Sequence, residues 1–337
     1  MSSHSSSAVV DLATTLIDIE SISGNEQAMA DFLADYLRPR GWEVQYQLVA
    51  EGRPNIYAHR PGCRPRLIYN SHIDTVPPYF PARRDETTLY GRGACDTKSL
   101  IAAQLLAGEK LLAEGREDFG YLYVVGEEVD HIGMIKANEL GLSPQFLIVG
   151  EPTESKLARR QKGILKLKLT TQGKAAHSGY PHTGINALDP MLDLLERIRR
   201  HPWPSEAQLG ETTVNIGVLR SGRAANVVPD EAYAEVLFRV VTHQAELLEE
   251  VRTMAGDAVE VSVIASNDPT ELSTLDGYET SVVSFNTDIP YLKFDGRAFL
   301  WGAGSIMDAH TAREQIEIAD LEAAVDIYAE LARTCLG

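Results

Sequence analysis

The stretch YNSHIDTVPP, residues 69–78, ends an apolar run with a histidine and a carboxylate. His72 and Asp74 stand two positions apart, so at the end of a strand both side chains project from the same face. The run then stops at a double proline, which offers no N–H to a sheet ladder. A buried strand that ends in this way needs partners from elsewhere in the chain, and those partners decide the fold and the chemistry.

The composition sets the broad class of protein. With 337 residues, the chain is long enough for two domains. Its 31 basic and 48 acidic residues give a formal net charge of −17, which argues against nucleic acid or an anionic membrane as the main partner. No apolar run approaches the ~18 residues of a membrane-spanning helix.

The first residues, MSSHSSS, lack the basic start and the apolar core of a secretory signal. We therefore expect a short flexible tail and a cytoplasmic protein. The three cysteines are too few and too scattered for a disulfide framework or a thiolate metal site; they are Cys63, Cys95 and Cys335.

The first half of the chain alternates strands with helices. An amphipathic helical region is expected over residues 8–40, and a strong helix over about 99–114. Short apolar strands precede and follow the second helix. This alternation predicts a largely parallel sheet covered by helices on both faces. The expected strands are WEVQYQLV (42–49), NIYAHR (55–60), RLIYNSHID (66–74), YLYVVGEE (121–128) and QFLIVGEP (145–152).

The pattern changes after Arg160. GILKLKLTTQG, residues 163–173, alternates apolar and polar side chains, as a half-exposed strand does. Helices at about 185–200 and 244–255 and three further strands complete a β-α-β-β-α-β order, which is typical of a ferredoxin-like unit. From about residue 267 the chain returns to the first domain and ends in a helix at about 319–335.

We therefore predict an α/β catalytic domain with an inserted α+β domain. Residues 1–160 and 267–337 form the catalytic domain, and residues 161–266 form the insertion.

Asp96 lies in the loop GRGACDTKS, residues 91–99, just before a helix. Lys98 and Ser99 imitate the end of a phosphate-binding loop, but Arg92 and Thr97 occupy positions that such a loop needs as glycine. The phosphate-loop reading is therefore rejected, and Asp96 is a candidate carboxylate ligand.

Two apolar strands are followed by the dipeptide Gly-Glu, which leads to Glu127 and Glu128 in one case and to Glu151 in the other. Taken alone, Glu127 and Glu128 could be two solvated side chains in a turn. In an α/β sheet, however, sites form at the carboxyl ends of the strands, so these carboxylates are expected to converge with His72.

If they share one cleft, the four carboxylates cannot all remain ionised without cations; they are those of Asp96, Glu127, Glu128 and Glu151. Either their pKa values rise steeply or metal ions neutralise them, and the nearby imidazole of His72 favours metal. Oxygen and imidazole donors suit Zn²⁺, with Co²⁺ or Mn²⁺ as substitutes. A second metal needs a second histidine, and His310 in GAGSIMDAHTARE is the best candidate.

The motifs together resemble one family. It is the di-zinc metallohydrolase family of acetylornithine deacetylase, succinyl-diaminopimelate desuccinylase, aminoacylase and glutamate carboxypeptidase. The resemblance covers almost the whole chain and implies a di-zinc aminopeptidase/carboxypeptidase-like catalytic domain, with a mixed sheet and helices on both faces, and an inserted ferredoxin-like domain. The motifs that carry it are SHIDTVP, LYGRGACDTK, VVGEE, VGEPT, AAHSGYP, NVVPD and GSIMDAHTAREQI.

The resemblance implies a role for each candidate ligand. One divalent ion would be held by His72 and Glu151 and a second by Glu128 and His310. Asp96 would bridge the two ions.

The resemblance also implies roles beside the metals. Glu127 would be the general base, and Asp74 would hold the imidazole of His72 in orientation. The peptide bond between Asp96 and Thr97 is expected to be cis.

The inserted domain would contribute to the substrate site. His177, in AAHSGYP, matches a histidine that donates to the oxyanion in the neighbouring subunit, which implies a homodimer and a closing motion. Asn226, Arg239 and the backbone near Gly304 match positions that hold a substrate carboxylate. His131 and His182 fall outside the pattern and are expected on the surface.

We therefore expect a metal-dependent amidohydrolase that removes an N-acyl group from an amino acid, with N-acetylornithine as the first candidate substrate. A carboxypeptidase or dipeptidase on the same scaffold is the alternative, and a non-catalytic binding relative is a third reading. The chain departs from the family pattern at Ser99, in GAGS, and in GEEVDHIGM, which lacks the glycines usual after the paired glutamates. None of these departures removes a ligand, but they could change loop geometry and pocket shape.

Overall fold

A computed structural model describes residues 7–337 and divides the chain into two compact units. Unit 1 comprises residues 7–159, 272–281 and 287–337, and unit 2 comprises residues 160–271 and 282–286. The predicted boundaries were 160/161 and 266/267, so the chain leaves unit 2 a few residues later than expected. Apart from Ser7, the predicted tail MSSHSSS lies outside the described residues.

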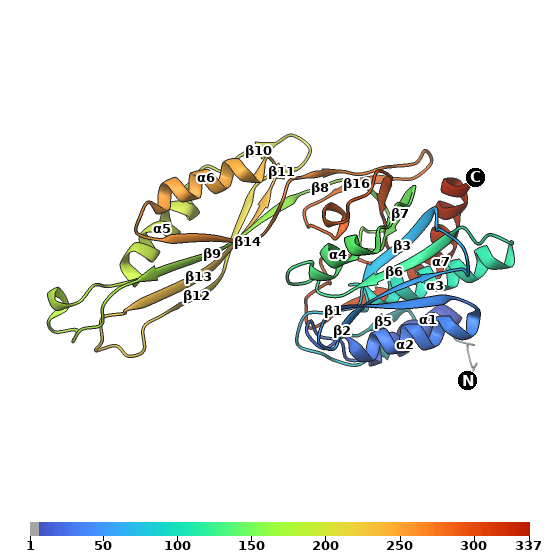
Figure 1. The fold of residues 1–337 in the computed structure, drawn as a ribbon, viewed down its shortest axis with the longest axis horizontal. Coiled ribbons are helices and arrows are strands. Elements are labelled where there is room, and N and C mark those ends of the chain that lie inside the picture. Colours follow the sequence, from blue (N-terminus) through green and yellow to red (C-terminus); the bar gives the residue numbers. More distant parts are fainter. Residues whose placement is uncertain (1–6) are drawn as a thin grey trace. The chain divides into compact units, whose positions relative to one another are not determined.

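Unit 1 is built on a mixed sheet, in which β3 lies between β6 and β7 (Figure 1). The four strands β6, β3, β7 and β17 run parallel to one another, whereas β1, β2 and β6 pair in antiparallel fashion. The bounds are β1 (Glu43–Ala50), β2 (Arg53–His59), β6 (Phe119–Val124), β3 (Leu67–His72), β7 (Phe146–Val149) and β17 (Arg297–Leu300). The strands β8 (Leu157–Gln161) and β16 (Thr280–Val283) include residues of both units.

The helices of unit 1 share one apolar core with the buried side chains of this sheet. In α3, most residues are buried, which explains the weak polar face of its sequence. The remaining helix, α4 (Ile132–Ala137), contacts β1, β2 and β6. The core helices are α1 (Ala8–Asp18), α2 (Gln27–Leu37), α3 (Lys98–Ala113) and α7 (Ile318–Leu336).

The predicted helical region 8–40 is two helices, because a tertiary contact interrupts it. Ile22 forms a parallel bridge with Thr75, and the N–H of Ser23 donates to the carbonyl of Thr75 at 3.1 Å. Residues 21–23 thus pair with the chain that follows β3, and α1 ends at Asp18.

Several short elements complete unit 1. A small antiparallel sheet joins β18 (Gln315–Glu317), β5 (Thr88–Tyr90) and β4 (Arg83–Arg84). Single 3-10 turns cover Arg38–Arg40, Asn138–Leu140 and Ile289–Tyr291. Within residues 7–337, no helix combines the length and the apolar character needed to cross a membrane.

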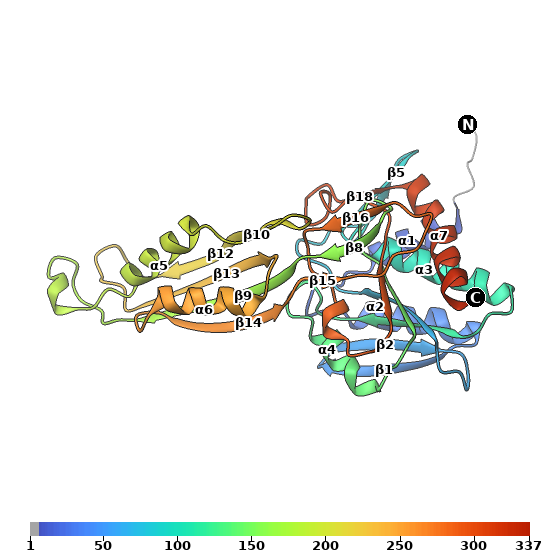
Figure 2. The ribbon, with the colours of Figure 1, turned by 90° about the horizontal axis from the view of Figure 1, so that it is seen from above.

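Unit 2 has the predicted β-α-β-β-α-β order, and its four main strands form an antiparallel sheet in the order β12-β13-β9-β14. Helices α5 and α6 lie side by side on one face of this sheet (Figures 1 and 2). Alternate side chains of β9 and β13, such as Leu167 and Phe238, are buried in the core that these helices cover. The bounds are β9 (Gly163–Gln172), α5 (Leu188–Arg200), β12 (Thr213–Ser221), β13 (Glu231–Val240), α6 (Gln244–Ala255) and β14 (Glu260–Asn267), with short elements Pro181–Thr183, β10 (Ser205–Glu206), β11 (Gly210–Glu211) and β15 (Thr270–Glu271).

Candidate metal centre

Three parallel strands of unit 1 deliver the first candidate ligands. His72 is the last residue of β3, and the chain continues from β6 to Glu128 and from β7 to Glu151. Because β3 pairs in parallel with both β6 and β7, these side chains emerge at the same edge of the sheet.

Asp96 joins two groups of ligands. Its Oδ1 atom lies 3.0 Å from Nε2 of His72, and its Oδ2 atom lies 3.2 Å from Nε2 of His310. Glu151 completes the first group at 3.7 Å from His72, and Glu128 completes the second at 2.9 Å from His310. Within each group of three, the possible ligand atoms lie within 4.8 Å of one another.

The two groups therefore share one carboxylate that presents a separate oxygen to each. The Asp96–Thr97 peptide is cis, as expected. His72, Asp96 and Glu151 are buried, whereas the side chain of His310 is 52% exposed. The first group is enclosed by the protein, and the second is open to solvent on the side of His310.

The carboxylates and imidazoles of these groups perturb one another strongly. Burial raises the pKa of Glu151 well above its usual range, and the charge of His72 opposes this rise only in part. Hydrogen bonds to Asp96 and Glu128 raise the pKa of His310 to about 10. Burial would raise the pKa of Asp96, but the hydrogen bonds from His310 and His72 have the larger combined effect and lower it. So much charge in a buried site favours bound cations.

The donor set fits a pair of divalent metal ions. Imidazole and carboxylate groups are ligands that zinc accepts, and an aspartate with two outward-facing oxygens suits a bridging position. Among the described residues, the Oε1 atom of Glu128 is buried without a hydrogen-bond partner. A buried carboxylate oxygen with no donor is costly, and a cation would satisfy it.

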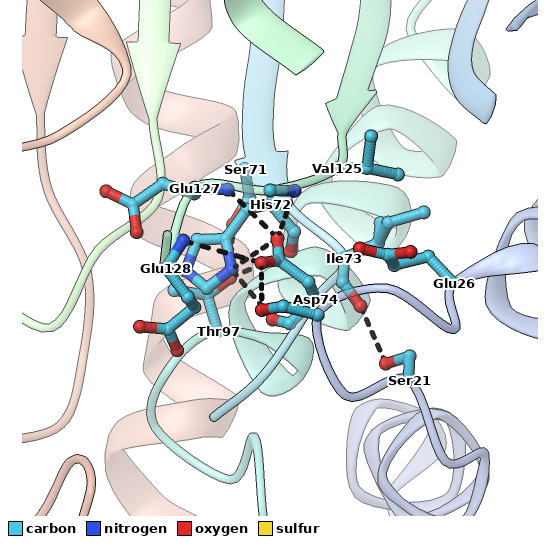
Figure 3. A network of polar contacts seen from close by, with 12 residues as sticks. Ser21, Glu26, Ser71, His72, Ile73, Asp74, Thr97, Val125, Glu127 and Glu128 are labelled. Carbon is cyan, nitrogen blue, oxygen red and sulfur yellow. Dashed lines mark hydrogen bonds and ion pairs between the residues drawn. The ribbon is translucent and has the colours of Figure 1, made fainter. Parts of the chain in front are cut away.

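Asp74 contacts the turn that carries Glu127 and Glu128 as well as His72, whereas only a role in orienting His72 was predicted. Nδ1 of His72 lies 2.9 Å from the backbone carbonyl of Asp74, whereas the carboxylate of Asp74 is 3.6 Å away. That carboxylate instead accepts the backbone N–H groups of Gly126 at 2.9 Å and Glu127 at 3.2 Å, and the hydroxyl of Ser23 at 2.6 Å. Figure 3 shows Asp74 at the centre of this network, with the carboxylates of Glu127 and Glu128 pointing away from it.

Asp74 thus orients the imidazole of His72 mainly through its main chain, and its side chain anchors the turn that carries the paired glutamates. Burial would raise the pKa of Asp74, but the nearby imidazole of His72 and the contacts with Ser23 and the N–H of Glu127 lower it. The carboxylate is therefore held in the charged form that the backbone donors require.

Glu127 lies beside the ligands without belonging to either group of three. Burial raises its pKa to about 8, and the nearby charges of His131 and His72 act in the opposite direction. A carboxylate with a pKa near neutrality can both accept and release a proton.

The prediction of a surface position for His131 was wrong. The residue is only 4% exposed, and its Nδ1 atom lies 2.9 Å from Oδ1 of Asp288. The same nitrogen is 3.9 Å from Oε1 of Glu127. Local sequence could not reveal this, because Asp288 is 157 residues away.

A second buried pair was also missed. The Oε1 atom of Glu314 accepts backbone N–H groups from Gly93 at 3.0 Å, Cys95 at 3.2 Å and Asp96 at 3.1 Å. Its Oε2 atom accepts from Arg92 at 2.5 Å, and both side chains are 1% exposed. The only signal in the sequence was that two opposite charges, Arg92 in GRGACDTKS and Glu314 in GSIMDAHTAREQI, lie inside motifs.

Three of the predicted substrate residues lie in unit 2. His177 is exposed, forms an antiparallel bridge with Val227, and accepts the N–H of Gly179 on Nδ1 at 3.0 Å. The carbonyl of Asn226 accepts the N–H of Ser178, so His177 and Asn226 lie on adjacent segments. Arg239 lies on β13, opposite Ile164 of β9.

The exposure of His182 and the burial of Cys95 agree with the prediction, whereas the substrate role of Gly304 stays a prediction. His182 is exposed. In unit 1, Gly304 has φ +90°, and a Cβ there would lie 2.9 Å from Cβ of Cys95, so its backbone needs glycine. Cys95 itself is fully buried, in keeping with a packing role.

Comparison with known proteins places this architecture. Residues 159–261 match the family described as the peptidase dimerisation domain. A peptidase M20 domain-containing protein of Schizosaccharomyces pombe is 38% identical over 328 residues, which cover 93% of this chain and 81% of that protein. A probable carboxypeptidase of Talaromyces marneffei is 38% identical over 384 residues, with 96% and 85% covered.

Solved structures share the fold at lower identity. A tripeptidase from Staphylococcus aureus superposes with a TM-score of 0.77 at 20% identity, covering 98% of each chain. An M20 family metallo-carboxypeptidase from Sulfolobus solfataricus superposes with a TM-score of 0.77 at 18% identity, and the match covers 96% of this chain and 98% of that one. A dinuclear metal-binding M20 peptidase from Bacillus subtilis superposes with a TM-score of 0.66 at 15% identity, and the match covers 96% of each chain.

The relatives are similar over most of their own length, and the match is not confined to one domain. The chain therefore belongs to the M20 peptidase family, which confirms the predicted fold and the predicted class of enzyme, a hydrolase of linear amide or peptide bonds.

Proposed function

We propose that this protein is a dinuclear metallohydrolase that cleaves the amide bond next to a free carboxylate, as a carboxypeptidase or dipeptidase does. The observation that carries the proposal is the pair of three-residue groups that share Asp96, with Glu127 beside them. The relatives named probable carboxypeptidase support this substrate class.

In this proposal each ion has its own ligands. His72 and Glu151 would hold one ion, Glu128 and His310 would hold the other, and Asp96 would be a ligand of both. Zn²⁺ is the expected metal, with Co²⁺ or Mn²⁺ as substitutes. Two such ions, when bound, lower the pKa of water and polarise an amide carbonyl.

Glu127 is the proposed general base. Its carboxylate accepts the proton of the attacking water and later delivers that proton to the leaving amine. The burial that raises its pKa to about 8 supports this role, because a base must also be able to act as an acid in the second half of the reaction.

Unit 2 and Gly304 supply the proposed substrate contacts. Arg239, Asn226 and the backbone at Gly304 hold the substrate carboxylate, since a guanidinium binds a carboxylate through two parallel hydrogen bonds. His177 donates to the oxyanion of the tetrahedral intermediate. We propose that it does so across a homodimer, which the match to a peptidase dimerisation domain supports.

Removal of an N-acyl group is the second candidate, with N-acetylornithine as the first substrate to test. The resemblance of FNTDIPYL and GSIMDAHT to acetylornithine-deacetylase-like sequences favours it. Both reactions break a linear amide bond beside a carboxylate and would use the same ligands and base. The three free cysteines support a cytoplasmic enzyme for either reaction.

A substrate panel tests the proposal. Protein loaded with Zn²⁺ or Co²⁺ is incubated with dipeptides, longer peptides, N-acetyl, N-succinyl and N-formyl amino acids, and C-amidated peptides. We expect amine release from dipeptides or peptides with a free carboxyl end and none from their C-amidated forms. Release confined to N-acyl amino acids would favour the second candidate. No release above a Glu127→Gln control would overturn both.

A further inference from the structure

His131 is held more rigidly than a loop histidine usually is. Its ring stacks on Tyr291, with centroids 4.2 Å apart and an interplanar angle of 16°. Its Nδ1 atom lies 2.9 Å from Oδ1 of Asp288, which is itself 2% exposed. Its backbone N–H donates to the carbonyl of Gly126 at 2.8 Å. The imidazole is thus held by Tyr291 and Asp288, and the main chain of the residue is held by Gly126.

The ring lies next to the proposed general base. Nδ1 of His131 is 3.9 Å from Oε1 of Glu127, so one nitrogen faces the buried carboxylate of Asp288 and the partly buried carboxylate of Glu127. The N–H group of Glu127 is anchored by Asp74, which fixes the main chain at this point. The orientation of the Glu127 carboxylate then depends on the groups around it, and of the two imidazoles that act on it, His131 is the one that is not a candidate metal ligand.

The backbone of His131 indicates that the imidazole has a use. Its φ is 57°, a left-handed conformation that glycine or asparagine adopts at lower cost than histidine. The segment reads GEEVDHIGM, so histidine and not glycine occupies this left-handed position. An apolar ring could stack on Tyr291 equally well, but it could not donate a hydrogen bond to Asp288. A buried polar group in an unfavourable backbone conformation often marks a functional constraint.

We propose that His131, oriented by Asp288 and Tyr291, is a positioning residue that holds the carboxylate of Glu127 in place for proton transfer. The inference rests on the proposed role of Glu127 as general base. His131 does not touch the substrate in this proposal, and it takes no proton from it. Its effect on the reaction passes through the geometry of Glu127.

Matched substitutions separate a donor from mere packing. Asparagine and aspartate have the same shape and both tolerate a positive φ, but only asparagine places an N–H donor near the position of Nδ1. We expect His131→Asn to retain kcat within about threefold. We expect His131→Asp to lower kcat about 10- to 100-fold with little change in KM, because a misplaced base slows the reaction without weakening substrate binding.

A double-mutant cycle tests whether His131 and Asp288 act together. His131→Gly, Asp288→Ala and the double variant are compared, since glycine accepts the backbone conformation. The double variant should lose about as much kcat as either single variant. The exposed His243–Asp268 pair, with a contact of 3.1 Å, provides a control of the same chemistry, and His243→Asn should leave kcat unchanged.

The outcomes distinguish this inference from the proposed function. Absence of turnover in the wild type, or full activity in Glu127→Gln, would overturn the assignment of the base. If the wild type is active, Glu127→Gln is inactive and His131→Gly keeps the wild-type kcat with two metal ions bound, the inference alone fails. Equal losses of kcat and of Tm in His131→Asn and His131→Asp would reduce His131 to a packing residue and would also overturn it.

Discussion

The Oδ1 atom of Asp74 accepts the backbone N–H of Glu127 at 3.2 Å, so the residue beside a candidate ligand also anchors the proposed base. The same oxygen accepts the N–H of Gly126, and the backbone carbonyl of Asp74 lies 2.9 Å from Nδ1 of His72. One residue therefore ties the end of β3 to the turn after β6. Disturbing its side chain should affect the base more than the histidine.

Replacement of Asp74 by alanine tests whether its side chain supports the turn of Glu127 while its backbone carbonyl orients His72. We expect Asp74→Ala to lower kcat about 10- to 100-fold, because the turn that carries Glu127 and Glu128 loses its acceptor. Steady-state kinetics and metal analysis on the same preparation are the measurements. Ser23→Ala, which removes one donor at 2.6 Å and leaves the backbone contacts, should have a smaller effect. Equal effects of the two variants would contradict the role assigned to the backbone contacts.

Metal binding should stabilise the fold through Asp96. A ligand that binds only the folded state adds about 4 kcal/mol when its concentration is 1,000 times its Kd. Adding Zn²⁺ or Co²⁺ to metal-free protein should therefore raise Tm, and metal analysis should find two ions per chain. Asp96→Ala removes the shared ligand, so most of the rise in Tm and at least one ion should be lost. An unchanged rise would show that the metal binds elsewhere.

The metal-free protein should lose stability as the pH rises, and Glu127 should contribute to that loss. Its folded-state pKa of about 8 lies above its usual value of 4.5. Between these values the unfolded chain has released a proton that the folded chain retains, so the free energy of unfolding falls with increasing pH. Glu127→Gln removes this term and should raise Tm more at pH 8 than at pH 5.

Thermal unfolding with a chelator present checks the prediction for Glu127. The wild type and Glu127→Gln are compared at several pH values between 5 and 8. A gain in Tm that is the same across this range would mean that the carboxyl group does not titrate within it.

The buried Arg92–Glu314 pair should be costly to break. Loss of one partner leaves the other charge buried, and such changes cost about 3–5 kcal/mol. We expect Glu314→Gln to lower the free energy of unfolding by this amount in a denaturant titration. Glu139→Gln, which breaks an exposed pair with Lys136, should cost less than about 1 kcal/mol. Comparable losses in the two variants would contradict the structural importance of the buried pair.

Much of the candidate site could be predicted because its parts repeat a simple pattern. Strands that end in a histidine or in Gly-Glu mark the same edge of a parallel sheet, and the structure brings His72, Glu128 and Glu151 together there. The helices at 98–113 and 244–255 were also predicted, since their apolar spacing and length are local properties.

The missed features all depend on long-range contacts. His131 gains its role from Asp288 and Tyr291, and the break between α1 and α2 comes from the pairing of Ile22 with Thr75. No periodicity within a short window contains such information. The substrate roles of His177, Asn226 and Arg239 remain predictions.

The division of unit 1 along the chain has a consequence for biosynthesis. The imidazole of His310 lies in the final returning segment, and unit 2 intervenes between it and the residues at the sheet edge. Domains tend to fold as units while the ribosome is still adding residues. A nascent chain released before residue 310 would contain a complete set of carboxylates and one histidine but would lack the second. The second group of ligands can therefore form only after His310 has been synthesised, and a chain truncated before that residue would keep Asp96 and Glu128 without their histidine.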